Sequence, residues 1–104
     1  MIKNLTDKDF EKETSTGVTL TDFWAAWCPP CKMQGPIVEK LDEELGNKVK
    51  VTKMDVDANQ EIPTKFGIMS IPTLIVKKDG KVVEKLVGLR TKDQLTQVLS
   101  QYTN

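Results

Sequence analysis

Apolar residues recur along the chain with the two-residue period of strands and the longer period of helices. Residues 18–25 carry apolar side chains on both faces of a predicted strand, which is typical of a central strand covered on two sides. Residues 48–57 alternate well enough to form a second strand. Between them, residues 32–45 predict an amphipathic helix whose apolar stripe has four-residue spacing and places Met33 in the core. That stripe is formed by Met33, Ile37, Leu41 and Leu45.

Two short helices are predicted in polar segments. Thr6 can cap a first helix, and Leu5 can pack onto Phe10 at its start. Asn59 can cap another helix, but Pro63 limits the hydrogen bonding there, so we expect a distorted element or a single turn.

The last third of the chain predicts a hairpin and then a helix. Asp79 and Gly80 tolerate the positive backbone angles of a tight turn, which joins strands at residues 74–77 and 81–87. A capping box at residues 91–94 begins a terminal amphipathic helix. The order of elements predicts a single α/β domain over the whole chain.

Composition and charge narrow the possible functions. The chain has 104 residues, enough for one domain, with 15 basic and 15 acidic side chains. A net charge of zero gives no general attraction to nucleic acid or to an anionic membrane. No apolar run reaches membrane-spanning length, and the start at Met1 shows no export signal, so we expect a soluble cytoplasmic protein.

The only two cysteines stand two residues apart in Trp27-Cys28-Pro29-Pro30-Cys31, directly after the first long strand. In a reducing compartment such a pair is more typical of catalysis or metal binding than of a structural disulfide. Two thiolates alone leave a tetrahedral zinc ion half-liganded, which disfavours a metal site. If Cys28 is the N-cap of the following helix, the helix dipole stabilises its thiolate and makes it the nucleophile. Pro29 and Pro30 have no N–H, so the amide of Cys31 is the nearest donor to that sulfur.

Asp22 and Lys53 are polar residues on apolar faces of the predicted strands. Asp22 is either a buried carboxyl group with a raised pKa or a group at the strand end that reaches water. Lys53 either buries its stem, with the ammonium near Asp22, or extends to solvent as lysines commonly do. The pattern alone leaves both alternatives open.

Several short motifs stand in a fixed order along the chain. They are Asp22-Phe23-Trp24-Ala25, Trp27-Cys28-Pro29-Pro30-Cys31-Lys32, Pro36, Lys53, Asp57, Ile71-Pro72-Thr73, Asp79-Gly80 and Val87-Gly88. In this order and at this length the chain resembles the thioredoxin family over essentially its whole extent. The resemblance implies a central mixed five-stranded sheet flanked by four helices, with the cysteines at the carboxyl end of a central strand.

The resemblance also implies an activity and catalytic residues. It implies a protein-disulfide reductase in which Cys28 attacks a client disulfide and Cys31 resolves the mixed disulfide. Asp22 and Lys53 are implied to form a buried pair beneath the cysteines, with Asp22 accepting the proton of Cys31. Pro72 is implied to be cis and to face the disulfide.

An apolar docking surface around the thiols is expected to receive an extended client segment by shape and backbone hydrogen bonds. Its members are Trp27, Pro29, Pro30, Ile71, Pro72, Val87 and Gly88. For Ile71 and Val87, packing in the core is the alternative. The resemblance implies a monomer without bound cofactor or metal, active in electron transport and redox homeostasis. A partner thioredoxin reductase would supply electrons from NADPH through FAD.

Pro29 departs from the family's usual motif, which has glycine at that place. Because Pro30 restricts the backbone of Pro29, we predict a more oxidising redox potential, which an unchanged redox equilibrium in Pro29→Gly would contradict. Two other functions stay open. A specialised thiol oxidase, isomerase or maturation factor is favoured by Pro-Pro and disfavoured by the missing export signal. A non-enzymatic binding module would keep its activity after both cysteines were replaced by serine.

Overall fold

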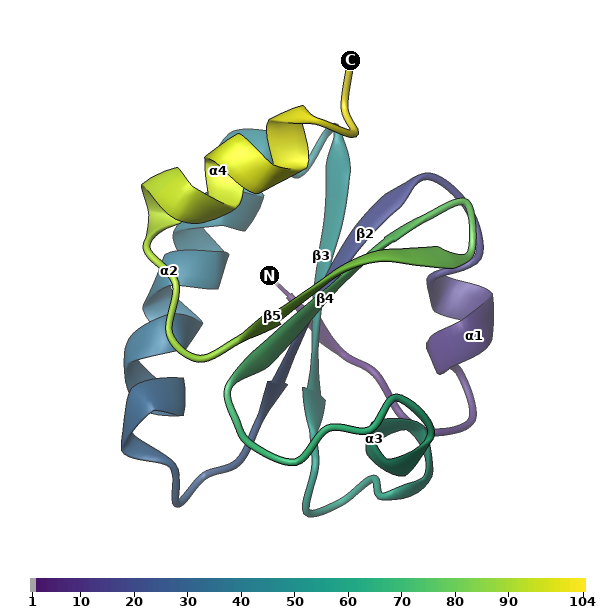
Figure 1. Cartoon of the computed structure of the whole chain (residues 1–104), viewed down its shortest axis with the longest axis vertical. Coiled ribbons are helices and arrows are strands. Elements are labelled where there is room, and N and C mark those ends of the chain that lie inside the picture. The colour runs from purple at the N-terminus through teal and green to yellow at the C-terminus, as the bar shows by residue number, and fades with distance from the viewer. Residues whose placement is uncertain (1) are drawn as a thin grey trace.

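The computed structural model describes residues 2–104, and Met1 lies outside the described residues. Its strands are β1 (Lys3–Asn4), β2 (Val18–Trp24), β3 (Val49–Asp55), β4 (Thr73–Lys78) and β5 (Lys81–Val87). Its helices are α1 (Phe10–Glu13), α2 (Pro29–Leu45), α3 (Glu61–Lys65) and α4 (Lys92–Ser100) (Figure 1). Within residues 2–104 this is the predicted mixed sheet of five strands with four helices, so the predicted fold class is confirmed.

The sheet has the order β1-β3-β2-β4-β5, with β2 at its centre. β3 runs parallel to β1 and β2, whereas β4 is antiparallel to β2 and β5. In this register Asp22 of β2 lies between Lys53 of β3 and Leu74 of β4. The central strand therefore carries a carboxyl group into the middle of the sheet and then leads directly into α2 (Figure 1).

Apolar clusters lie on both faces of the sheet, as the pattern of residues 18–25 predicts. One cluster packs α2 and α4 on the sheet through Val18, Leu20, Val38, Leu41, Val49, Val51, Leu74, Val76, Leu95 and Leu99. The other packs α1 and α3 on the opposite face through Leu5, Phe10, Phe23, Met54, Ile62 and Ile75. The central strand is covered on two sides. This packing fixes the position of its carboxyl end and therefore of the cysteines that follow it.

The prediction that Met33 lies in the core is wrong, because its side chain is 61% exposed. Residues four apart on a helix are rotated by about 40° around the axis, so two such steps turn Met33 about 80° away from Leu41. The buried side of α2 instead follows mixed three- and four-residue steps. It is formed by Cys31, Gln34, Val38 and Leu41.

The first helix begins later than its predicted cap. The Asp9 amide donates to Thr6 Oγ1 at 3.3 Å, and the Thr6 amide donates to Asp9 Oδ1 at 2.7 Å. This pair closes a turn, and α1 itself starts only at Phe10. Leu5 and Phe10 lie in the same apolar cluster, in agreement with the predicted packing.

The prediction that Asn59 caps the next helix is wrong. The Asp7 carboxylate accepts hydrogen bonds from the amides of Glu61 and Ile62, at 3.2 and 2.8 Å. Asn59 Oδ1 instead accepts from the Asp7 amide at 2.9 Å. The cap of α3 therefore comes from a segment 54 residues earlier, which a local pattern does not reveal.

The hairpin and the terminal helix follow the sequence signals. Asp79 and Gly80 have φ of 50° and 84°, as the predicted tight turn requires. The Thr91 hydroxyl accepts from the Gln94 amide at 3.1 Å, and the Gln94 side chain accepts from the Thr91 amide at 3.0 Å. This is the predicted capping box at the start of α4.

Candidate active site

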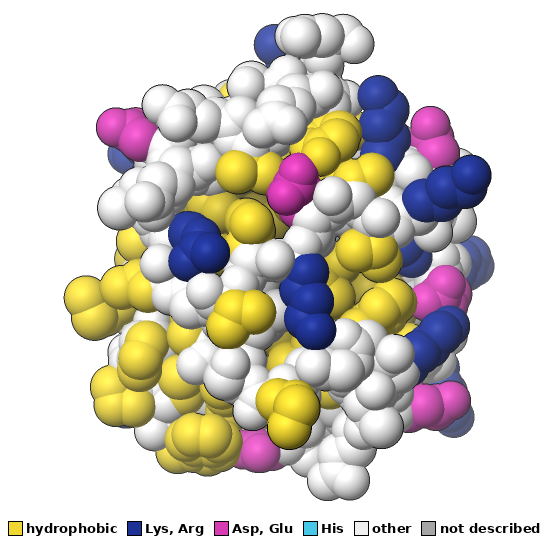
Figure 2. All heavy atoms as spheres, viewed as in Figure 1, with side chains coloured by type: hydrophobic (Ala, Val, Ile, Leu, Met, Phe, Trp, Pro, Cys, Tyr) yellow, Lys and Arg dark blue, Asp and Glu magenta, His cyan; other side chains and the backbone are white. Residues whose placement is uncertain are grey.

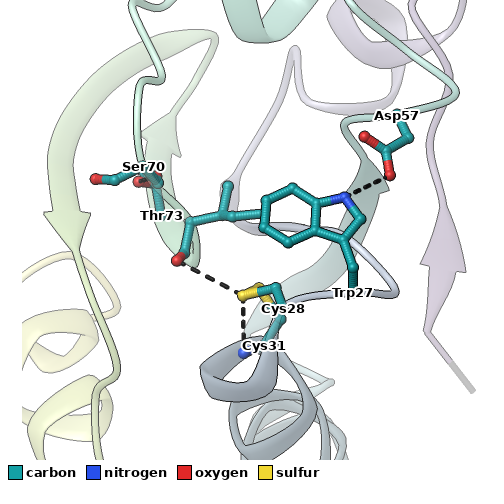
Figure 3. The surroundings of a disulfide bond; sticks show 7 residues. Trp27, Cys28, Cys31, Asp57, Ser70 and Thr73 are labelled. Carbon is teal, nitrogen blue, oxygen red and sulfur yellow. Dashed lines mark hydrogen bonds between the residues drawn. A yellow bond between two sulfur atoms is a disulfide. The ribbon is translucent and has the colours of Figure 1, made fainter.

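The turn between β2 and α2 brings the two cysteines together. Cys28 is the N-cap of α2, with Pro29 and Pro30 as the first helical residues, and it forms a disulfide with Cys31. The Cys31 amide donates to Cys28 Sγ at 3.3 Å (Figure 3). Cys28 therefore occupies the predicted place at the positive end of the helix, with the predicted donor. In this disulfide state both cysteines are buried, at 2% and 5% exposure.

The loop before β4 lies against the disulfide. The Ile71-Pro72 peptide bond is cis, as the family resemblance implied. The Ile71 carbonyl oxygen lies 3.7 Å from Cys28 Sγ. The Gly88 amide donates to the Pro72 carbonyl at 2.8 Å, and Gly88 has a φ of +94°, which side-chain-bearing residues rarely adopt. The fold thus joins the loop before β4, the end of β5 and the start of α2 around one disulfide.

Most of the predicted docking surface is accessible. Trp27 is 66% exposed, and its indole N–H donates to Asp57 Oδ2 at 2.9 Å, from a loop that follows β3 (Figure 3). Val87 is 50% exposed, so the alternative that it packs in the core is wrong. Ile71 is half-buried and Pro72 is buried.

Apolar side chains gather around the start of α2. Figure 2 shows hydrophobic groups concentrated at the lower left, over the region where Figure 1 places the passage from β2 to α2. A hollow of about 140 Å³ lies between Trp27 and the segment that includes the end of α3 and the loop after it. It is lined by Trp27, Val56, Pro63, Ile68, Met69 and Ile71. This face of the protein therefore presents exposed apolar side chains together with a recess that can receive an apolar side chain.

Asp22 is a buried carboxyl group on the inner side of the disulfide. It is 2% exposed, and its Oδ1 has no hydrogen-bond partner among the described residues. Burial raises the pKa of Asp22 to about 7, although the positive charge of Lys53 works in the opposite direction. Asp22 and Cys31 line one cavity of about 310 Å³, together with Lys53.

Among the described residues no hydrogen bond or ion pair joins Lys53 to Asp22. Lys53 nevertheless lies opposite Asp22 across β2 and β3, lines the same cavity and acts through its charge to lower the pKa of Asp22, although it is half-buried rather than buried. Its ammonium lies 5.8 Å from the centre of the Trp24 ring. The long stem of lysine lets the charge avoid full desolvation, which explains why only the carboxyl group is buried.

Gln34 and Arg90 were not singled out by the sequence. Gln34 is fully buried on α2, where its amide donates to the Arg90 carbonyl at 3.0 Å and accepts from the Arg90 amide at 2.8 Å. No local pattern marks this long-range pairing. A weak signal was the polar residue three positions after Cys31, on the inner side of the helix.

Two classes of feature are not found within residues 2–104. No group of three or more His, Cys, Asp or Glu side chains is placed to hold a metal ion. None of the helices is long and apolar enough to cross a membrane.

Comparison with known proteins decides the family. The family model described as Thioredoxin matches residues 1–101. The chain belongs to the thioredoxin family. The thioredoxin of Listeria monocytogenes is 55% identical over 102 residues, which cover 98% of this chain and 99% of that protein. The thioredoxins of Bacillus subtilis and Staphylococcus aureus are 54% and 46% identical over 101 residues, or 97% of each chain.

Family membership and the disulfide together establish the activity. The chain is a protein-disulfide oxidoreductase that acts by thiol–disulfide exchange, and the Cys28–Cys31 pair is its redox-active group. The family works without a bound cofactor and is generally reduced by thioredoxin reductase.

Proposed function

We propose that this chain is a general reductant of client proteins in the cytoplasm, where it contributes to electron transport and redox homeostasis. A thioredoxin reductase recharges it, and NADPH and FAD stay with that partner. The observation that carries the proposal is the disulfide at the start of α2, enclosed by the cis Pro72 loop. Near-complete coverage by relatives named thioredoxin supports it.

Cys28 is proposed as the nucleophile. Its thiolate attacks one sulfur of a client disulfide, the other client sulfur leaves as a thiolate, and Cys28 is then joined to the client. Its place at the helix N-terminus and the Cys31 amide at 3.3 Å both stabilise negative charge on this sulfur. Cys31 then attacks Cys28 Sγ, which releases the second client thiolate and forms the disulfide.

Asp22 is proposed as the acceptor of the proton that Cys31 must lose before it attacks. A carboxylate whose pKa is raised to about 7 is a far better base than an exposed one, and it still ionises near neutral pH. The shared cavity of about 310 Å³ gives the proton a route. Lys53 lines the same cavity and tunes the pKa of Asp22 through its positive charge.

Client segments are proposed to bind in extended form across the docking surface. The exposed rings of Trp27, Pro29 and Pro30 and the Val87 side chain supply apolar contact, and backbone hydrogen bonds to an extended segment add to it. The surface consists of Trp27, Pro29, Pro30, Ile71, Pro72, Val87 and Gly88. Recognition by shape and backbone suits a reductant with many clients.

Trapping with insulin as the client tests the proposed roles. Cys31→Ser should accumulate a mixed disulfide with insulin, because the attack by Cys28 is retained and resolution is lost. Cys28→Ser should form none. The wild type should turn over with thioredoxin reductase and NADPH. If only Cys28→Ser formed the mixed disulfide with insulin, Cys31 would be the nucleophile and Cys28 the resolving cysteine. Efficient oxidation of dithiols without turnover driven by the reductase would favour a specialised oxidase.

A further inference from the structure

Arg90 places a cation at the edge of the docking surface. It follows β5 by three residues and is the one arginine of the chain. Its Nη1 donates to the Val87 carbonyl at 2.9 Å, in a solvent-exposed hydrogen bond. A Cβ placed on Gly88 would lie 3.7 Å from the same nitrogen. The guanidinium group therefore lies directly beside the part of the surface that Val87 and Gly88 form.

The position of Arg90 is fixed from inside the protein. Its backbone N–H and C=O both bond to the fully buried side chain of Gln34, at 2.8 and 3.0 Å. Gln34 lies one turn after Cys31 on α2. The cation is thus held at a set place relative to the cysteines, with its backbone and its side chain both anchored.

The guanidinium group keeps donors for a further partner. It carries five N–H donors, and the contact with Val87 uses one nitrogen. Within residues 2–104 no carboxylate forms an ion pair with Arg90. Lys92, two residues later, differs in that its ammonium is 2.7 Å from Glu44. Arg90 is a positioned cation without an anionic partner.

We propose that Arg90 is a specificity-determining residue that favours client segments with an Asp or Glu near the cysteine under attack. A carboxylate beside the docked backbone meets the free edge of the guanidinium group, whose geometry suits paired hydrogen bonds. The residues of the docking surface itself carry no charge, so this contact discriminates between otherwise similar clients. The inference rests on the proposed docking of clients at this surface.

A matched set of synthetic peptides tests the proposal. Each peptide has one cysteine and differs only in an Asp, Asn or Lys placed two, three or four residues to either side of it. The termini of each peptide are blocked, and the cysteine is supplied as a mixed disulfide with 2-thiopyridine, which carries no charge. The Cys28 thiolate of the reduced protein attacks the peptide sulfur, the thiopyridine leaves and takes up a proton to form 2-thiopyridone, and the second-order rate constant is read from the absorbance of 2-thiopyridone.

At one or more positions, the wild type should react about two- to fivefold faster with the Asp peptide than with the Asn peptide. It should react more slowly with the Lys peptide than with the Asn peptide. Arg90→Gln should bring the ratio of the rate constants for the Asp and Asn peptides close to one. Arg90→Lys should keep part of the preference, since it retains the charge and loses the paired donors. Lys81→Gln, an exposed lysine at the opposite end of β5, removes the same charge and should keep the full preference.

Three results would overturn the proposal. The first is an Asp preference that survives in Arg90→Gln, and the second is equal Asp and Asn rates in the wild type at every position. The third is an equal loss of the Asp preference in Lys81→Gln, which would assign the effect to net charge. If the Asn peptides fail to react with the wild type, the proposed function fails first, which separates the two conclusions.

Discussion

Asp22 is an ionisable group in a place that disfavours its charge. It is buried on the central strand, and one of its carboxylate oxygens has no hydrogen-bond partner within residues 2–104. Burial raises the pKa of Asp22 to about 7 against an ordinary value of 3.8. Burial of this carboxyl group therefore lowers the stability of the protein at neutral pH, and the proposed role of Asp22 as the base for Cys31 gives a reason for keeping it there.

The pH dependence of stability follows from this shift. Between about pH 4 and pH 7 the unfolded chain has lost a proton that native Asp22 keeps, so the free energy of unfolding falls as the pH rises. One pKa unit corresponds to about 1.4 kcal/mol, which gives an upper limit of about 4 kcal/mol above pH 7. We expect Asp22→Asn to lose this fall, as measured by urea unfolding of the disulfide form from pH 5 to 8.

Asp93→Asn is the matched control, because Asp93 is exposed in the first turn of α4. Its stability curve should run parallel to that of the wild type. If the Asp22→Asn curve also ran parallel to the wild-type curve, the raised pKa would be contradicted. Comparing slopes with pH removes any constant effect of the amide itself on packing.

At the scale of the elements, predicted turns and caps were confirmed where both partners are close in the sequence, and the predicted cap of α3 failed because its partner is distant. The Asp79-Gly80 turn and the capping box of α4 depend on residues within four positions, and both are present. The cap of α3 comes from Asp7, which is far away in sequence, so the prediction of Asn59 was wrong. A sequence pattern shows which hydrogen bonds a segment can make with its near neighbours. It does not show which distant segment will contact it in the folded protein.

Removing the distant cap should weaken α3. Asp7→Ala leaves the amides of Glu61 and Ile62 without their acceptor, and loss of such a cap typically costs about 1 kcal/mol. Urea unfolding should show that loss, and amide hydrogen exchange at Ile62 should become faster. Lys8→Ala, at an exposed neighbour of Asp7, should change neither quantity. Unchanged exchange at Ile62 in Asp7→Ala would show that α3 does not need this cap.

The parts of the site that belong to a family motif could be predicted from the sequence. The positions of Cys28 and Trp27 and the cis bond of Pro72 follow from a family pattern that the fold reproduces. Lys53 lies opposite Asp22 as implied but is only half-buried, because its long stem lets the charge avoid full desolvation. Gln34 gave only a weak signal, since the hydrogen-bond partners of a buried polar side chain are the backbone groups that it contacts in the folded state.

At the scale of the whole molecule, balanced charge predicts little electrostatic steering. The net charge is zero, and the docking surface consists of uncharged residues. We therefore expect the rate constant for an uncharged peptide disulfide to change less than about twofold between about 0.02 and 0.5 M NaCl. Stopped-flow measurement with the Asn peptide checks this. A steep decrease with salt would point to a charged contact outside the docking surface.

Gln34 joins two parts of the molecule that meet only in the folded state. It lies on the helix that carries Cys31, and its partner Arg90 follows the strand that ends in Val87. Gln34→Leu removes the polar side chain at similar size and leaves the partly buried N–H and C=O of Arg90 without the partners that they have in the wild type. We expect a loss of about 1–3 kcal/mol in the free energy of unfolding, since unpaired buried polar groups carry that penalty.

The same substitution should also weaken client binding, because it frees the segment that holds Val87 and Gly88 beside the disulfide. We expect KM for insulin to rise severalfold while kcat changes little, since Cys28 and Cys31 keep their places. Gln97→Leu, at an exposed glutamine of α4, is the control and should affect neither stability nor KM. A stability loss with unchanged KM would mean that Gln34 supports the fold alone. A rise in KM would show that the catalytic helix sets the geometry of the docking surface through Gln34.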